Sequence, residues 1–258
     1  ALNCAAPDEG NILLLDKVAN AAQRETYLAP LARGDVRSSF AMTEPSPGAG
    51  ADPDRLSTTA VRDGAEWIIN GKKWFITGAT GAAFSIVMAR TGDAATMFLV
   101  DGTNSGMRIE RQLDTLDSAF TGGHGQIVFE DCRVPAANLL GQEGQGFALM
   151  QHRLSLRRLE IGAWCLGFSH RALNMMIDHV TQRKTFGTLL ADRQAIQWWI
   201  ADGTTKMHAL RLMLVDAASR VKNGERLRSE LSMIKVYATE MATTIVDQAM
   251  QKIGRAHV

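Results

Sequence analysis

Two strand-like runs of the sequence end in a threonine whose hydroxyl could contact a bound ligand. The run 40–43 (Phe-Ala-Met-Thr) is followed by a loop, residues 44–52, that contains two prolines and two glycines. Prolines lack an amide donor and glycines loosen the backbone, so this loop cannot be regular structure. Free backbone amides beside a buried strand suit an anionic or ring-bearing ligand. A plain exit from strand to loop explains the same pattern and is the simpler interpretation.

The second run, residues 72–77, ends at Thr77. A hydroxyl at this position can donate a hydrogen bond to the edge of a ring. Thr77 and the aromatic Phe75 of the same run each have a structural alternative. Thr77 could be an ordinary β-branched strand residue, and Phe75 could be a core aromatic.

Two arginines of the C-terminal half could bind a charged group. Arg158 lies between Leu154 and Ile161 on an apolar helical face, where a charge needs a partner or must extend its head to water. Arg183 follows a long helical segment. Its guanidinium matches phosphate oxygens, whereas a cation that balances the helix dipole is the structural alternative.

Composition excludes several other classes of function. The 258 residues are 46% hydrophobic and 21% charged, with a net charge of +1, so bulk electrostatics favour neither nucleic acid nor a membrane surface. The apolar run at residues 13–15 is too short to span a membrane. The cysteines are widely spaced, which indicates neither a disulfide framework nor a metal site. The histidines also lack metal-ligand spacing, and we interpret five of them as surface or packing residues: His124, His152, His170, His179 and His208.

The elements that must position these residues fall into three consecutive parts. Residues 1–37 read as helix and loop, ended by Gly34. Residues 38–141 contain short strands and two hairpin signals, at residues 63–64 (Asp-Gly) and 70–71 (Asn-Gly), which predict a compact antiparallel barrel or sandwich. Residues 142–252 predict three long helices in an up-down bundle, the first about 50 Å long and closed by Gly187. The predicted fold class is therefore α+β.

Four motifs, in this order, resemble those of the acyl-CoA dehydrogenase family. They are residues 40–45 (Phe-Ala-Met-Thr-Glu-Pro), 72–79 (Lys-Lys-Trp-Phe-Ile-Thr-Gly-Ala), 129–135 (Phe-Glu-Asp-Cys-Arg-Val-Pro) and 183–187 (Arg-Lys-Thr-Phe-Gly). One such motif alone would be a weak signal, but four in order are highly specific. The run at residues 3–8 (Asn-Cys-Ala-Ala-Pro-Asp) is similar to a subgroup that is often linked to phosphotransferase-like partners.

The resemblance implies a chain that is shortened at both ends. Residues 1–37 would be the tail of an N-terminal helical domain, and residues 38–141 would be the middle β domain. Residues 142–252 would supply three of the four helices of a C-terminal bundle. Residues 253–258 do not fit the family, and we interpret them as an artefactual tail.

The resemblance also implies FAD as the cofactor. Thr43 would contact the pyrimidine end of the flavin and Thr77 its N5, while Phe75 takes the place of a ring-stacking tryptophan. Arg183 would cross a subunit interface to the neighbour's FAD pyrophosphate, which implies a homodimer or homotetramer. The expected cofactor-binding residues are Phe40, Met42, Thr43, Phe75, Ile76, Thr77, Arg183, Thr185 and Gln194.

Contacts to acyl-CoA are expected from Ala51, Ser155 and Arg158. The first two depart from the family, because Ala51 replaces a serine and Ser155 replaces an aspartate. The catalytic base is expected to be a glutamate of a C-terminal segment beyond this sequence. Arg157 occupies the family's alternative position for the base and cannot act as one, so Glu160, one turn away, is a weak candidate. Glu44 is interpreted as a residue that orients its loop.

Enzymes of this family convert an acyl-CoA to the trans-2-enoyl-CoA and pass electrons to an electron-transfer flavoprotein, so fatty acid β-oxidation is the implied setting. The implied compartment is a bacterial cytoplasm or an organelle matrix. An acyl-CoA oxidase or flavin monooxygenase of the same fold is an alternative, as is a non-catalytic module that binds FAD or acyl-CoA. No residue of the sequence separates these possibilities.

Overall fold

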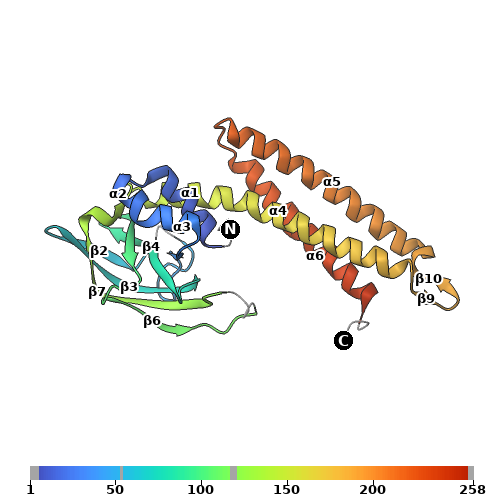
Figure 1. Cartoon of the computed structure of the whole chain (residues 1–258), viewed down its shortest axis with the longest axis horizontal. Coiled ribbons are helices and arrows are strands. Elements are labelled where there is room, and N and C mark those ends of the chain that lie inside the picture. The colour runs from blue at the N-terminus through green and yellow to red at the C-terminus, as the bar shows by residue number, and fades with distance from the viewer. Residues whose placement is uncertain (1–5, 53–54, 117–120, 255–258) are drawn as a thin grey trace. The chain divides into compact units, whose positions relative to one another are not determined.

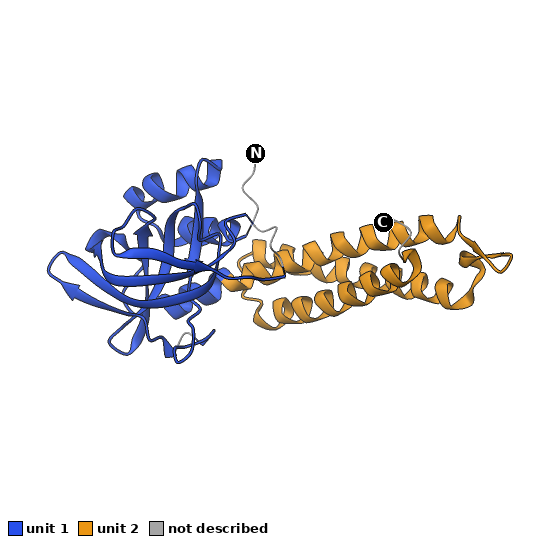
Figure 2. Cartoon of the chain, turned by 90° about the horizontal axis from the view of Figure 1, so that it is seen from below, with its two compact units in different colours: residues 1–153 blue, residues 154–258 orange. Residues whose placement is uncertain are grey.

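A computed structural model describes residues 6–52, 55–116 and 121–254 of the chain. The chain divides into two compact units, residues 1–153 and residues 154–258 (Figure 2). Asn3 and Cys4 of the N-terminal motif lie outside the described residues, as do residues 255–258 of the expected tail. The units divide inside a helix, and the predicted domain boundaries at residues 37, 141 and 252 stay predictions.

Short helical segments open the first unit (Figure 1). They are α1 (Asp8–Val18), α2 (Ala21–Gln23), the π-helical η1 (Arg24–Leu28) and α3 (Ala29–Arg33). Gly34 ends α3 with a φ of 78°, as the sequence predicts. Asp8 anchors α1 to the sheet, because it accepts hydrogen bonds from the backbone N–H and the hydroxyl of Ser38 at 2.8 and 2.7 Å.

Eight strands among the described residues form one sheet in the first unit. Seven of them lie in the order β6 (Met107–Gln112), β7 (His124–Pro135), β3 (Glu66–Thr77), β2 (Thr59–Asp63), β4 (Ala82–Thr91), β5 (Ala94–Asp101) and β8 (Leu139–Leu140). The eighth, β1 (Arg37–Ala41), pairs with β4. A short 3-10 helix, η3 (Ala136–Asn138), precedes β8. Alternate residues of these strands fill a common core, in which the rings of Trp67 and Phe98 lie 5.3 Å apart.

Most neighbouring strands are antiparallel, but β1 runs parallel to β4, and β2 meets β4 in parallel at Thr59. The predicted antiparallel sheet therefore contains parallel pairing at this place. Parallel neighbours need a crossover connection, which the loop after β1 and the β2–β3 hairpin provide. That hairpin turns at Asp63 and Gly64, as predicted. The predicted hairpin at residues 70–71 is wrong, because both residues lie inside β3.

The long helix α4 (Gly146–Val180) enters the second unit and has 35 residues, or about 50 Å, as expected. The prediction that Gly187 closes it is wrong. Gly187 instead has a φ of 79° in the turn of a small hairpin between β9 (Lys184–Thr185) and β10 (Thr188–Leu189). Next come η4 (Leu190–Asp192), α5 (Gln194–Lys222), which is followed by Asn223 and Gly224 as predicted, and α6 (Arg228–Ile253).

The three long helices pack around an apolar core in the second unit. Gly162 allows α4 to approach its neighbours, because an added Cβ would lie 2.6 Å from Cγ2 of Ile234. The apolar stripe predicted on α4 is confirmed at Met176 and Val180, which are buried, whereas Phe168 is 63% exposed. None of the described helices combines the length and apolar character that crossing a membrane requires.

Candidate functional site

A bulge in β3 exposes Phe75. The pairing of β3 with β7 is interrupted between Lys73 and Ile76, and Phe75 within the bulge has a φ of 53°. This left-handed conformation is strained for an aromatic residue, and strain of this kind collects at functional sites. Phe75 is 50% exposed and its ring lies 4.7 Å from that of Trp74. The alternative that Phe75 is a core aromatic is therefore wrong.

The chain that follows β1 lies against this bulge. β1 ends at Ala41, so Met42 and Thr43 come after the strand. The backbone N–H of Trp74 donates to the carbonyl of Thr43 at 3.0 Å. The ammonium of Lys73 donates to the carbonyl of Met42 at 2.9 Å. The structure thus brings Thr43 to the segment that carries Phe75, although a loop and β2 separate them in sequence.

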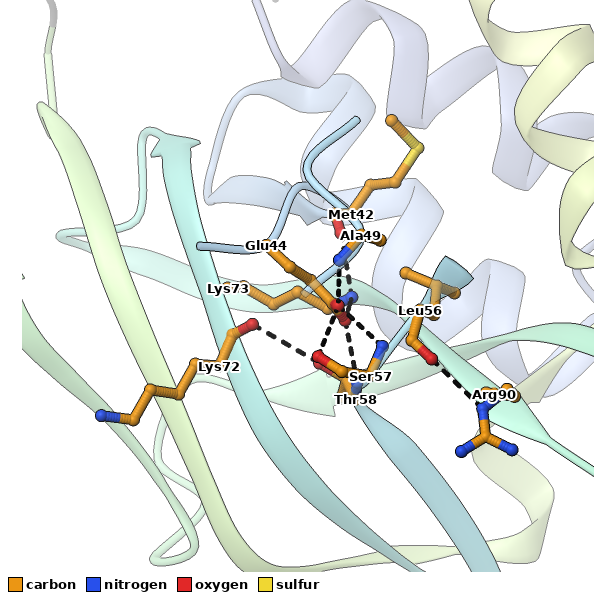
Figure 3. Close-up of polar contacts among 9 residues, drawn as sticks. All are labelled: Met42, Glu44, Ala49, Leu56, Ser57, Thr58, Lys72, Lys73 and Arg90. Carbon is orange, nitrogen blue, oxygen red and sulfur yellow. Dashed lines mark hydrogen bonds and ion pairs between the residues drawn. The ribbon is translucent and has the colours of Figure 1, made fainter. Parts of the chain in front are cut away.

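Glu44 holds the loop that begins at this point (Figure 3). Its Oε2 accepts hydrogen bonds from the backbone N–H of Ala49 at 3.0 Å and from both the backbone N–H and the hydroxyl of Ser57 at 2.7 Å. Its Oε1 accepts from the backbone N–H of Thr58 and from the ammonium of Lys73, each at 2.9 Å. One carboxylate therefore ties the two ends of the loop together, which confirms the loop-orienting interpretation of Glu44.

Lys73 is a buried cation that sequence reasoning missed. The side chains of Lys73 and Glu44 are both 0% exposed. Burial lowers the pKa of Lys73 to about 8, although the charge of Glu44 opposes this shift. Burial alone would raise the pKa of Glu44, but the charge of Lys73 and the hydrogen bonds outweigh it, so this pKa lies well below its ordinary 4.5. The sequence feature that could have revealed the burial of Lys73 is the alternation of residues along β3, since Trp67, Ile69 and Lys73 share its buried face.

Thr77, at the end of β3, faces His124 across the β3–β7 ladder. Its hydroxyl and Nδ1 of His124 share a hydrogen bond of 3.1 Å. Glycine permits this close approach, because an added Cβ on Gly122 would lie 2.7 Å from the carbonyl oxygen of Thr80. The interpretation of His124 as a surface or packing residue therefore omits this hydrogen bond. The sequence feature that could have indicated this contact is the unusual run at residues 122–125 (Gly-Gly-His-Gly).

Phe40 of β1 lies beneath the guanidinium of Arg153, whose Cζ is 4.1 Å from the ring centroid. Arg153 also donates hydrogen bonds to Oδ1 of Asn11 at 2.9 Å and to the carbonyl of Pro7 at 3.1 Å. This buried cation therefore joins α1, β1 and the start of α4. Sequence reasoning missed it, because an arginine is usually exposed and its partners lie far away in the sequence.

Three of the expected cofactor residues form a separate group in the second unit. The hairpin of β9 and β10 returns the chain, so that the N–H of Leu190 donates to the carbonyl of Arg183 at 2.9 Å. Arg193 donates to the carbonyl of Thr185 at 3.3 Å, and Gln194 is the first residue of α5. Arg183, Thr185 and Gln194 thus gather at the N-terminal end of α5, where unpaired helix amides favour an anion.

The expected substrate residues are divided between the two units. Ala51 is exposed in the loop of the first unit, whereas Ser155 and Arg158 are half-buried on α4 in the second. On the same helix, Arg157 donates to Glu160 at 3.2 Å and stacks on the ring of Trp164 at 4.2 Å. Glu160 is therefore engaged in an ion pair. Over the described ranges, no cluster of His, Cys, Asp and Glu residues could hold a metal ion.

Two family profiles match the chain. The profile of the acyl-CoA dehydrogenase middle domain matches residues 39–132, and that of the acyl-CoA dehydrogenase C-terminal domain matches residues 144–256. The chain belongs to the acyl-CoA dehydrogenase family. The first match contains Thr43, Phe75 and Thr77, and the second contains Arg158 and Arg183.

Two of three similar proteins are named for a particular acyl-CoA substrate. (R)-Benzylsuccinyl-CoA dehydrogenase of Thauera aromatica is 38% identical over 96% of this chain and 62% of its own length. Acyl-CoA dehydrogenase family member 11 of Homo sapiens is 35% identical over 99% of this chain and 34% of its own length. A glutaryl-CoA dehydrogenase of Mycobacterium smegmatis, solved in complex with FADH2, has a TM-score of 0.86 at 26% identity, over 95% of this chain and 63% of that chain. The chain thus spans less than two thirds of each of these three proteins.

Proposed function

We propose that this chain is part of a FAD-dependent acyl-CoA dehydrogenase, which oxidises an acyl-CoA thioester to the trans-2-enoyl-CoA and passes the electrons to an electron-transfer flavoprotein. The observation that carries the proposal is the bulge of β3, which presents Phe75 beside Thr43 and Thr77. An exposed aromatic ring next to hydroxyls and loop amides suits a flat ring with polar edges. The residues present therefore fit a flavin, which when bound supplies the acceptor for a hydride from the β-carbon.

Each part of the site has a separate task in this proposal. Thr43 and Thr77 would hold a bound flavin through hydrogen bonds, and Phe75 would offer an apolar surface to its ring. The buried pair of Glu44 and Lys73 fixes the loop beside them. Phe40, Met42 and Ile76 stay assigned to the cofactor in this proposal, and because the side chain of Ile76 is buried in the core, Ile76 would contribute through its backbone.

The group at the start of α5 would bind the pyrophosphate. Arg183 is exposed and can form charge-assisted hydrogen bonds with phosphate oxygens. Thr185 and Gln194 add neutral hydrogen bonds. In this proposal Arg183 serves the cofactor of a neighbouring subunit, so the active form is a homodimer or a homotetramer.

The reaction also needs a carboxylate that reaches the α-carbon and removes its proton. Glu160 is held by Arg157, and Glu44 is buried against Lys73. We therefore assign the base to a glutamate outside these 258 residues. Ala51, Ser155 and Arg158 are assigned to acyl-CoA binding.

The visible absorption spectrum after incubation with FAD and desalting tests the cofactor site. The chain should retain the flavin bands, and Thr43→Val or Thr77→Val should reduce the amount retained. Thr91→Val is the matched control, because Thr91 bonds to Thr96 elsewhere in the same sheet and this variant should retain as much FAD as the wild type. A wild-type chain without flavin would contradict the proposed site and leave the family membership unchanged.

A further inference from the structure

His124 is a half-buried histidine whose ring reaches one hydroxyl that the proposed function uses. Its Nδ1 lies 3.1 Å from Oγ1 of Thr77. The backbone that carries the ring is held on both sides: His124 is paired with Thr77 on β3, and its carbonyl accepts a hydrogen bond from the N–H of Leu113 at 2.8 Å. None of the four family motifs quoted above contains His124.

Glycines before and after His124 determine where its ring can lie. The N–H of Gly78 donates to the carbonyl of Gly123 at 2.8 Å. An added Cβ on Gly125 would lie 2.7 Å from Cβ of Ala79, so a larger residue would push β7 away from the end of β3. The local sequence therefore holds the histidine against the threonine.

A threonine hydroxyl carries one proton and rotates freely unless a partner holds it. When Nδ1 accepts the hydrogen bond, the proton of Thr77 points at the histidine. When Nδ1 carries a proton and donates, the proton of Thr77 is available to a ligand. The presence or absence of a proton on Nδ1 of His124 thus determines whether the Thr77 hydroxyl offers a ligand a hydrogen-bond donor or an acceptor.

We propose that His124 is a positioning residue for the flavin, acting through Thr77. Its Nδ1–H donates to Oγ1 of Thr77, fixes the rotamer of that side chain and leaves the threonine proton to donate to the flavin ring. Hydrogen bonds to the ring tune the electronic properties of a flavin, so His124 also affects the spectrum of the bound cofactor. This inference rests on the proposed function.

A double-mutant cycle tests the inference, with His124→Leu, Thr77→Val and the double variant compared with the wild type. Titration with FAD gives the Kd, and the visible spectrum gives the positions of the bound-flavin bands. Each single variant should raise the Kd by about 3- to 10-fold, the worth of one hydrogen bond. The double variant should bind no more weakly than Thr77→Val alone, and His124→Leu should shift the flavin bands.

Two further variants separate positioning from stability. His124→Gln keeps an N–H donor and should restore the Kd towards that of the wild type, which also guards against misfolding of His124→Leu. His152→Gln is the matched control, since His152 is half-buried in the same unit and contacts Lys17 at 3.3 Å. It should leave both the Kd and the bands unchanged.

Three outcomes would overturn the inference. In the first, the substitutions of His124 lower the urea midpoint of unfolding but leave the Kd and the flavin bands unchanged. In the second, the losses of the two single variants multiply in the double variant, so the residues act independently. In the third, the wild type binds no FAD, and then the proposed function fails as well. The first two outcomes leave the proposed function intact.

Discussion

At the scale of single residues, the candidate site depends on polar groups that are buried and paired. The role of Glu44 could be predicted, because a proline follows it at the start of an irregular loop. The partners of Lys73 and Arg153 could not, since they come from other elements that only the fold brings near. Sequence patterns report which face of a strand is buried, but they do not identify the partner of a buried charge.

Replacement of Lys73 by methionine should lower the free energy of unfolding by about 3–5 kcal/mol, because it leaves Glu44 buried without its counter-charge. The adjacent Lys72→Met is the matched control. Lys72 contacts Glu110 at 3.4 Å on the surface, and loss of such a pair costs less than about 1 kcal/mol. Urea denaturation measures the unfolding free energy of both variants. Equal losses would show that the buried pair stabilises the fold no more than the surface pair does.

The contribution of Glu44 to the free energy of unfolding should decrease at acidic pH. Its pKa in the folded chain lies below the ordinary 4.5, so its contribution is complete above about pH 4.5 and is lost as the pH falls further. Glu44→Gln resembles the protonated form at every pH. The difference in unfolding free energy between wild type and Glu44→Gln should therefore shrink as denaturation is repeated from neutral pH towards about pH 3. A constant difference would mean that the carboxylate charge does not matter.

At the scale of elements, the existence of strands and helices could be predicted better than their irregularities. The hydrophobic pattern indicated the strands and the three long helices. It could not reveal that Gly71 lies inside β3, because the cause is tertiary: an added Cβ would lie 2.5 Å from Oγ1 of Thr58. The bulge at Phe75 has the same kind of origin, since the chain after β1 bonds to it at Trp74. The candidate site is built from these irregularities.

Two glycines of α4 should respond in opposite ways to alanine. Gly162→Ala should lower the melting temperature, because its Cβ would lie 2.6 Å from Ile234 and 3.0 Å from Leu214. Gly167→Ala meets no atom within 4 Å, and it should stabilise the helix by up to about 1 kcal/mol. Thermal unfolding followed by circular dichroism compares the two. Destabilisation by Gly167→Ala would contradict the packing described for α4.

At the scale of the whole molecule, the α+β class and the family could be predicted from four ordered motifs. The parallel pairing of β1 with β4 could not, because strands so distant in sequence give no local signal of their pairing. The motifs also did not show that the expected cofactor residues fall into two compact units, with Thr43 and Thr77 in one and Arg183 in the other.

Complementation between subunits should test the proposed role of Arg183. Thr77→Val and Arg183→Ala should each retain less FAD than the wild type. If each site uses both subunits, a mixed dimer has one site with both residues intact, so one of its two sites should bind FAD as the wild type does and retention should exceed that of either variant alone. Co-expression with two affinity tags isolates these dimers for absorption spectroscopy. No recovery would mean that each chain supplies both residues to its own site.

The burial of Lys73 also makes it a natural reporter of motion. Acylating reagents cannot reach a side chain that is 0% exposed, so the Lys73 amine can react only after the structure around it opens. The rate at which Lys73 is modified, followed by mass spectrometry of the peptide that contains it, would therefore report how often the loop that Glu44 holds opens. The neighbouring Lys72 is half-exposed on the same strand, and its rate of modification provides an internal reference for the reactivity of the reagent.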